Sequence, residues 1–179
     1  MSSGAGEREE SKTVGLIGTP KVVQRDARTY LGIHAVVTMA TVDDTVQVLI
    51  GEVLGRPNVL TAATGAPLVR YDVIDMEREL AIQVGVPVHP GTPGDERAVA
   101  GILPAGRYLA ATHTGPYDEL VEATGAFRAW ASEHGYLFDV RPGDGAEVWG
   151  CRLEHYPTDP VKEPDPRRWE TVLEFRLRD

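Results

Sequence analysis

The chain has 179 residues, of which 42% are hydrophobic and 25% are charged, and these values are typical of one globular domain. No apolar run reaches the roughly 18 residues that a membrane span needs, and the net charge of −9 argues against nucleic-acid binding, which requires a basic face towards the phosphates. The single cysteine, Cys151, cannot form an internal disulfide, so with no export signal we expect a soluble cytoplasmic protein.

Residues 1–13 are rich in Ser, Gly, Glu, Arg and Lys and have almost no apolar side chains. Such a segment cannot bury enough apolar surface to fold, so we predict a flexible N-terminal tail. Residues 14–179 are then predicted to form one domain.

The first half of this domain, about residues 14–90, has the pattern of a strand, a helix and two further strands. Residues 22–37 are rich in Val, Ile, Tyr and Thr, which predicts a strand that bends at Gly32. Thr41 then predicts a helix N-cap, and apolar residues recur at helical spacing as far as Gly55. After a loop, the stretches 67–74 and 80–88 predict a hairpin.

The second half, about residues 95–179, repeats this order. Residues 102–112 predict a strand that is interrupted at 104–106, and Pro116 suits the first position of a second helix, which Gly135 ends. Residues 148–156 and 169–177 predict the last two strands. The fold class is therefore α+β, with two βαββ modules related by a pseudo-twofold axis. If both helices cover one face of the sheet, the opposite face forms a ligand groove between the modules.

The period of two in strands assigns side chains to this groove. In residues 148–156, Cys151 and Leu153 share one face, while Glu154 and Tyr156 lie on the other. With the apolar face in the core, Glu154 and Tyr156 point into the groove, and Tyr71 falls at the corresponding place in the first half. A carboxylate between tyrosines suits an organic cation, because ring faces attract cations and a desolvated carboxylate needs a charge partner.

An ordinary structural role for these residues stays open. Glu154 could instead pair with Arg152 or Arg176 on an exposed sheet face. The aromatic residues at strand or loop ends could wall a pocket or pack in the core. They are Trp149, Trp169 and Tyr136, with Tyr108 and Tyr117 equally ambiguous.

Metal and cofactor chemistry find no support in the sequence. The five histidines show no zinc-type spacing with each other or with Cys151, and the glycines near 91–94 lack the lysine and helix of a phosphate-binding loop. No serine nucleophile elbow occurs. We therefore expect no metal and no cofactor.

Several motifs between Pro20 and the C-terminus carry a family resemblance. They are the strand 67–71, Gly85-Val86-Pro87, the stretch 102–108, His113-Thr114-Gly115-Pro116-Tyr117, Trp130, Leu153-Glu154-His155-Tyr156, Thr158-Asp159-Pro160 and Trp169-Glu170-Thr171. Together they resemble the GyrI-like (gyrase-inhibitor-like) small-molecule-binding family, which includes the effector-binding domains of AraC-type and MerR-type multidrug regulators. The chain has no helix-turn-helix region, so it is similar to a stand-alone member.

The resemblance implies two βαββ modules and a drug groove with an inward glutamate on the penultimate strand. Glu154 matches that glutamate. The aromatics that ring it in the family correspond to Tyr71, Tyr156, Trp149 and Trp169. The family often has a second glutamate where this chain has Val172, which leaves open whether Glu174 replaces it.

Three functions follow as hypotheses. The first is binding of varied planar aromatic, often cationic, drugs, dyes and toxins, which would protect the cell. The second, implied by similar stand-alone proteins, is hydrolysis of cyclopropane-bearing DNA-alkylating toxins, with Glu154 as general base and Tyr156 or Tyr71 stabilising the oxyanion. The third is inhibition of a protein partner such as gyrase.

Overall fold

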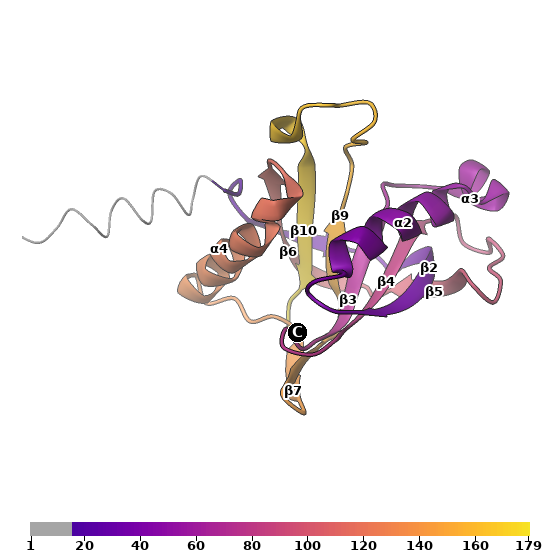
Figure 1. The fold of residues 1–179 in the computed structure, drawn as a ribbon. Coiled ribbons are helices and arrows are strands. Elements are labelled where there is room, and N and C mark those ends of the chain that lie inside the picture. Colours follow the sequence, from indigo (N-terminus) through magenta and orange to yellow (C-terminus); the bar gives the residue numbers. More distant parts are fainter. Residues whose placement is uncertain (1–15) are drawn as a thin grey trace, which may run out of the picture.

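The computed structural model describes residues 16–179 of the chain, so the predicted tail over residues 1–13 lies outside the described part. The fold is a mixed α+β arrangement built on one curled antiparallel sheet (Figure 1). Its strands are β1 (Lys21–Arg25), β2 (Arg28–Val37), β3 (Leu68–Ile74), β4 (Leu80–Pro87), β5 (Val99–Leu103), β6 (Gly106–Thr114), β7 (Val140–Gly143), β8 (Ala146–Trp149), β9 (Arg152–His155) and β10 (Glu170–Arg176). The helices are α2 (Val42–Leu54), α3 (Pro57–Ala62) and α4 (Leu120–Glu133), with the 3-10 turns η1 (Tyr117–Glu119) and η2 (Pro166–Arg168).

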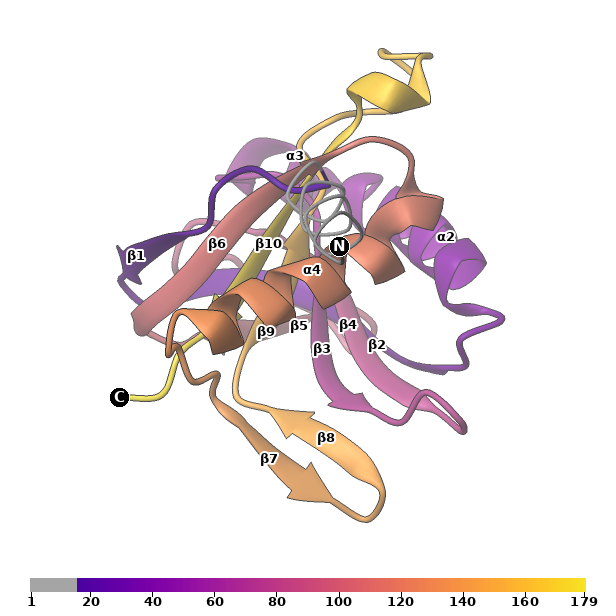
Figure 2. The same ribbon diagram turned by 90° about the vertical axis from the view of Figure 1, so that its left-hand side faces the viewer.

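The strand order is β1-β6-β10-β9-β3-β4-β2-β5. The first half of the chain supplies β3, β4 and β2, the second half supplies β6, β10 and β9, and the two sets meet where β9 pairs with β3. Val69 lies opposite Glu154 at that junction. The β7–β8 hairpin extends from the sheet beside β3 (Figure 2). Glu154 is therefore central in the sheet.

Apolar side chains cover both faces of the sheet. On one face α2 packs against β4 and β2, and α4 packs against β6, with Phe127 of α4 fully buried against Phe175. The other face carries a smaller cluster of buried residues, which are Tyr30, Leu68, Leu103, Tyr108, Cys151 and Leu153. The two faces thus differ in what covers them, helices on one and strand and loop side chains on the other.

Two of the predicted strands are divided in the structure. Residues 22–37 form β1 and β2, separated at Asp26 and Ala27, while Gly32 stays inside β2. The break follows from the topology, because β1 pairs with β6 and β2 pairs with β4, on different halves of the sheet. Residues 148–156 likewise divide into β8 and β9 around Gly150, whose missing side chain leaves room for the Asp139 carboxylate.

The helices begin and end close to their predicted positions. Thr41 and Gly55 flank α2, although the Thr41 side chain makes no capping bond and Gly55 has an ordinary φ of −76°. Gly135 follows α4 with a left-handed φ of 77°. The helix α3, which Pro57 opens, lies in a segment that we predicted as a loop, and the strand β7 was not predicted.

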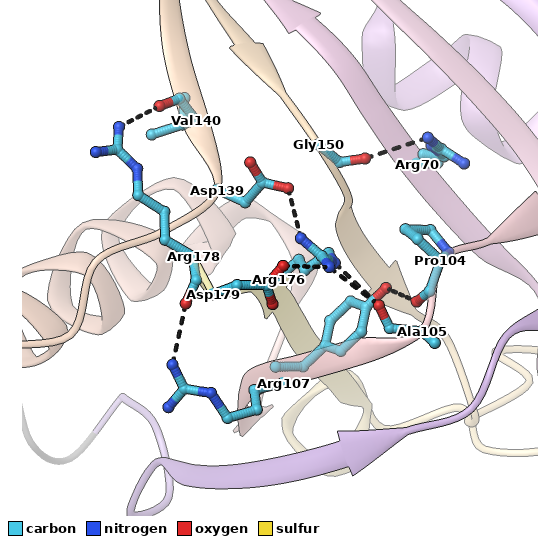
Figure 3. A network of polar contacts seen from close by, with 11 residues as sticks. Arg70, Pro104, Ala105, Arg107, Asp139, Val140, Gly150, Arg176, Arg178 and Asp179 are labelled. Atoms are coloured by element: carbon cyan, nitrogen blue, oxygen red, sulfur yellow. Dashed lines mark hydrogen bonds and ion pairs between the residues drawn. The ribbon is translucent and has the colours of Figure 1, made fainter.

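A polar network at the end of β10 fixes this strand against its neighbours (Figure 3). The Arg176 guanidinium donates to Asp139 Oδ2 at 2.9 Å and to the Ala105 carbonyl at 3.1 Å. Arg178 donates to the Val140 carbonyl at 2.8 Å. Arg176 therefore pairs with Asp139 and not with Glu154, and it anchors the strand that lies beside β9.

Candidate ligand-binding groove

A cavity of about 520 Å³ lies between α2 and α4 over the middle of the sheet. Val42 and Val46 of α2 form one wall, Leu120 and Val121 of α4 form the other, and Glu154 lies between them. Our expectation that the Glu154 groove would open on the face opposite the helices was therefore wrong. Each helix packs on its own half of the sheet, and the space over the β9–β3 junction is left between them.

The register of the sheet explains why Glu154 faces the helices. Leu173 lies opposite Glu154 in the β10–β9 pair, so the two side chains share a face, and Leu173 belongs to the core under the helices. Leu153, Cys151 and Glu174 point to the other face. The alternation of residues 151–156 was predicted correctly, but the faces were exchanged.

Two tyrosine hydroxyls hold the Glu154 carboxylate. Tyr156 donates to Glu154 Oε2 at 2.6 Å, and Tyr71, from the adjacent strand β3, donates to the same oxygen at 3.2 Å. Glu154 is 5% exposed. Burial raises the pKa of Glu154, and the two hydroxyls together with Arg152 offset only part of that effect.

The tyrosines themselves stay protonated. Burial, followed by the neighbouring carboxylate, raises the pKa of Tyr71 and of Tyr156 well above 10. Both hydroxyls therefore remain donors at neutral pH. Within residues 16–179, Glu154 Oε1 accepts no side-chain hydrogen bond, so this oxygen is available to a ligand.

Arg152 is the nearest buried cation, yet it makes no ion pair within the described part of the chain. Its guanidinium lies over the rings of Phe175, Trp149 and Tyr71, at 4.6, 4.9 and 5.4 Å from their centroids. Burial lowers the pKa of Arg152, and the attraction of Glu154 opposes this. The ion pair with Arg152, the alternative to a groove role for Glu154, is thus not formed.

Three aromatic rings form a continuous wall beside the carboxylate. Tyr117 contacts Tyr156 edge to face at a centroid distance of 5.6 Å and lies 4.7 Å from the Trp169 ring. The Trp169 indole is held by a 2.8 Å hydrogen bond from Nε1 to the Glu163 carbonyl. A flat ligand in the cavity would meet these rings and the carboxylate together.

The cavity is acidic. Its lining contains four carboxylates, of Asp43, Asp44, Asp118 and Glu154, and no Lys, Arg or His residue. The first three belong to the N-terminal turns of α2 and η1. Acidic residues in the first turn of a helix are also expected from the helix dipole, so the sequence alone did not mark these three as cavity residues.

The predicted aromatic residues divide between the cavity and the core. Tyr156 and Trp169 line the cavity, and Tyr71 contacts Glu154 from β3. Trp149 does not line it, because this residue is buried against Phe138 and Phe175.

Tyr136 and Glu174 also lie away from the cavity. Tyr136 stacks on Trp130, whose ring is 5.9 Å away, at the far end of α4. Glu174 lies on the opposite face of the sheet, where Arg25 and Arg28 bind it and where Val172 also lies, so neither position brings a second carboxylate to the Glu154 groove.

Sequence analysis did not assign several of the lining residues. They are Met39, Val42, Asp43, Asp44, Val46, Gln47, Tyr117, Asp118, Leu120, Val121 and Pro160. Most belong to helix faces, which we assigned to the core or to solvent. No local sequence pattern predicts a cavity between two helices.

Over residues 16–179 no group of three or more His, Cys, Asp or Glu side chains is placed to hold a metal ion. No helix in that range is both long and apolar enough to cross a membrane.

Comparison with known proteins identifies one family and several solved structures with a similar fold. The family model of the GyrI-like small molecule binding domain matches residues 18–177. The EcmrR C-terminal domain superposes with a TM-score of 0.67 at 16% identity, covering 90% of this chain and 98% of that chain. SAV2435 bound to tetraphenylphosphonium has a TM-score of 0.62 at 8% identity, covering 89% of this chain and 94% of that one.

A third structure is described as a hydrolase from Listeria innocua. It has a TM-score of 0.55 at 13% identity and covers 96% of this chain and 98% of its own. At such identities these likenesses establish the fold alone. The comparison with curated proteins found no match.

Proposed function

The chain belongs to the GyrI-like small molecule binding domain family, and from that premise we propose that it binds planar aromatic cations of varied structure in the groove between α2 and α4. A protein with this activity would protect the cell by sequestering drugs, dyes or toxins. The strand-helix-strand-strand order on each side of the β9–β3 junction supports an origin of the fold as two βαββ modules related by a pseudo-twofold axis.

The observation that carries the proposal is the buried Glu154 carboxylate, which has tyrosine donors but no ion-pair partner within residues 16–179. A carboxylate removed from water is costly unless a cation compensates it, and its raised pKa reflects that cost. A cationic ligand would supply the missing charge. The Tyr117, Tyr156 and Trp169 rings would add cation–π attraction of about 0.5–2 kcal/mol.

Tolerance of different ligands follows from the chemistry of the other walls. Met39, Val42, Val46, Leu120 and Val121 offer apolar contact without directional hydrogen bonds. Such contacts depend on area more than on a fixed pattern of polar groups, and methionine adapts its shape readily. The groove would then select for positive charge and aromatic surface and accept many outlines.

A pair of ions with the same outline and opposite charge tests the proposal. Tetraphenylphosphonium and tetraphenylborate each carry four phenyl rings on one central atom, so calorimetric titration with both separates charge from shape. We expect saturable binding of the cation, with a Kd in the range of about 1–100 µM, and at least tenfold weaker binding of the anion. Equal affinity for the two ions would show that apolar contact alone drives binding.

Hydrolysis is a second candidate, favoured by the contact between Tyr156 and Glu154. A carboxylate with a raised pKa is a suitable general base, and a tyrosine hydroxyl 2.6 Å from it can turn to a developing oxyanion. Incubation with a cyclopropane-bearing alkylator, followed by mass spectrometry, tests this activity. Glu154→Gln should lower turnover by about 10² or more with the melting temperature unchanged, and an alkylator that is bound but recovered intact would leave binding as the function.

A further inference from the structure

A second cavity, of about 450 Å³, lies on the face of the sheet opposite the groove. Its ionisable side chains are those of Arg25 and Arg28 at the β1–β2 connection, His155 of β9 and Glu174 of β10. His155 follows Glu154 in β9, so successive side chains of one strand face the two cavities.

The second cavity is basic, whereas the groove is acidic. Glu174, with 2% of its side chain exposed, accepts from Arg28 Nη2 at 2.6 Å and from Arg25 Nη2 at 3.1 Å. His155 Nε2 lies 3.5 Å from the same carboxylate, too far for a good hydrogen bond. Two guanidinium groups thus face one carboxylate, which leaves a local positive charge in a chain of net charge −9.

The two arginines have donors that the protein does not use. A guanidinium offers five N–H groups, and Glu174 takes up one nitrogen of each side chain. Both Nε atoms are buried without a hydrogen-bond partner in the described part of the chain. The Arg25 and Arg28 side chains are nevertheless 40% and 26% exposed, so a ligand can reach the guanidinium groups.

Apart from Thr29 and Thr64, the rest of the lining is apolar. It includes Pro87, Val88, Pro90 and Val172. These side chains give no hydrogen bond to an inorganic ion, but they can pack on the hydrocarbon part of an organic acid.

We propose that this second cavity is a binding site for a small organic carboxylate. The carboxylate accepts from Arg25 and Arg28, and the body of the ligand packs on Pro87, Pro90 and Val172. A phosphate ion fits less well, because its second charge would face Glu174 and its oxygens would meet the apolar wall. This proposal does not depend on the function of the Glu154 groove.

Benzoate is the test ligand, with benzamide as its neutral counterpart and inorganic phosphate as the competing anion. Titration of ¹⁵N-labelled protein should give saturable shifts at the amides of Thr29, Thr64 and Val172, which line the cavity. Benzamide and phosphate should each bind at least about tenfold more weakly than benzoate. No saturable shift with benzoate, equal binding of benzamide, or tighter binding of phosphate would overturn the proposal.

Two substitutions should act in opposite directions. Arg28→Gln should weaken benzoate binding at least about tenfold, because it removes a charged donor. Glu174→Gln should strengthen it at least about threefold, because it removes the carboxylate that competes for both guanidinium groups. The second variant keeps the test decisive if the first is too unstable to study.

A third arginine provides the matched control. Arg141→Gln, at an exposed position of β7 outside the cavity, removes the same charge and should leave benzoate affinity within about twofold. Equal losses in Arg28→Gln and Arg141→Gln would mean that benzoate responds to net charge and not to a built site. Weaker binding to Glu174→Gln would overturn the placement of the ligand carboxylate at Arg25 and Arg28.

Discussion

Removal of the Tyr156 hydroxyl should raise the pKa of Glu154 and move the pH dependence of cation binding. In Tyr156→Phe the carboxylate loses a donor that lies 2.6 Å from Oε2, while the Tyr71 hydroxyl at 3.2 Å remains. Hydrogen bonds to charged groups contribute about 1.5–3 kcal/mol. Because one pKa unit corresponds to about 1.4 kcal/mol, the pKa of Glu154 should rise by about one to two units.

The assay is the affinity for a cationic dye measured between about pH 4 and pH 8, where the dye keeps its charge. A protonated Glu154 has no charge to offer, so affinity should fall as the pH decreases through the raised pKa of this residue. In Tyr156→Phe the midpoint should move to higher pH. Tyr71→Phe is the matched control, and its longer hydrogen bond predicts a smaller shift in the same direction.

Three results would contradict this prediction. They are an unmoved midpoint in Tyr156→Phe, a midpoint that moves to lower pH, and a dye affinity that does not depend on pH. Each would mean that the hydroxyl does not stabilise the charged carboxylate to which the ligand binds.

Three further predictions concern stability. Gly85→Ala places a methyl group against the Leu31 carbonyl oxygen. The free energy of unfolding, measured with urea, should therefore fall by at least about 1–3 kcal/mol. An unchanged unfolding midpoint would contradict this packing. Phe127→Ala removes a fully buried side chain of α4 and should lower the free energy of unfolding by about 3–5 kcal/mol in the same assay. A decrease below about 1 kcal/mol would contradict the burial. Burial alone would raise the pKa of Glu174, but His155 and Arg28 lower it to about 2. The charged Glu174 carboxylate should therefore stabilise the folded state above the unfolded pKa of about 4.5, and this contribution should be lost as the pH falls towards 2. Thermal melts of Glu174→Gln should lack that part of the acid dependence, and identical acid profiles would contradict the depressed pKa.

Local patterns were sufficient to predict much of the fold. The hairpin β3–β4 and the helices α2 and α4 were predicted because their apolar residues follow a regular period and their ends carry turn residues. The division of residues 22–37 into β1 and β2 was missed because it depends on which distant strands pair with each part. No sequence pattern near Asp26 indicates that the chain passes there from one half of the sheet to the other.

The candidate site was predicted only in part, because it too depends on how distant parts of the chain come together. Alternation in β9 placed Glu154 with Tyr156, but the face that the helices cover depends on how the connections cross the sheet. Trp149 lies in β8, and the irregular backbone at Gly150 and Cys151 interrupts the alternation. Trp149 consequently packs in the helix-side core, the same side as Glu154, although it is an odd number of residues away.

Titration of a rhodamine-type cationic dye into the native protein, Glu154→Gln and Glu147→Gln determines whether Glu154 is the counter-ion of the bound ligand. Glu147 is a more exposed carboxylate on β8, paired with Arg128, and its replacement removes the same charge away from the groove. We predict saturable binding in the micromolar range, a loss of at least about tenfold in Glu154→Gln, and a change within about twofold in Glu147→Gln, with all three proteins folded. Equal dye affinity in the native protein and Glu154→Gln would contradict the claim that this buried carboxylate is the counter-ion of the ligand.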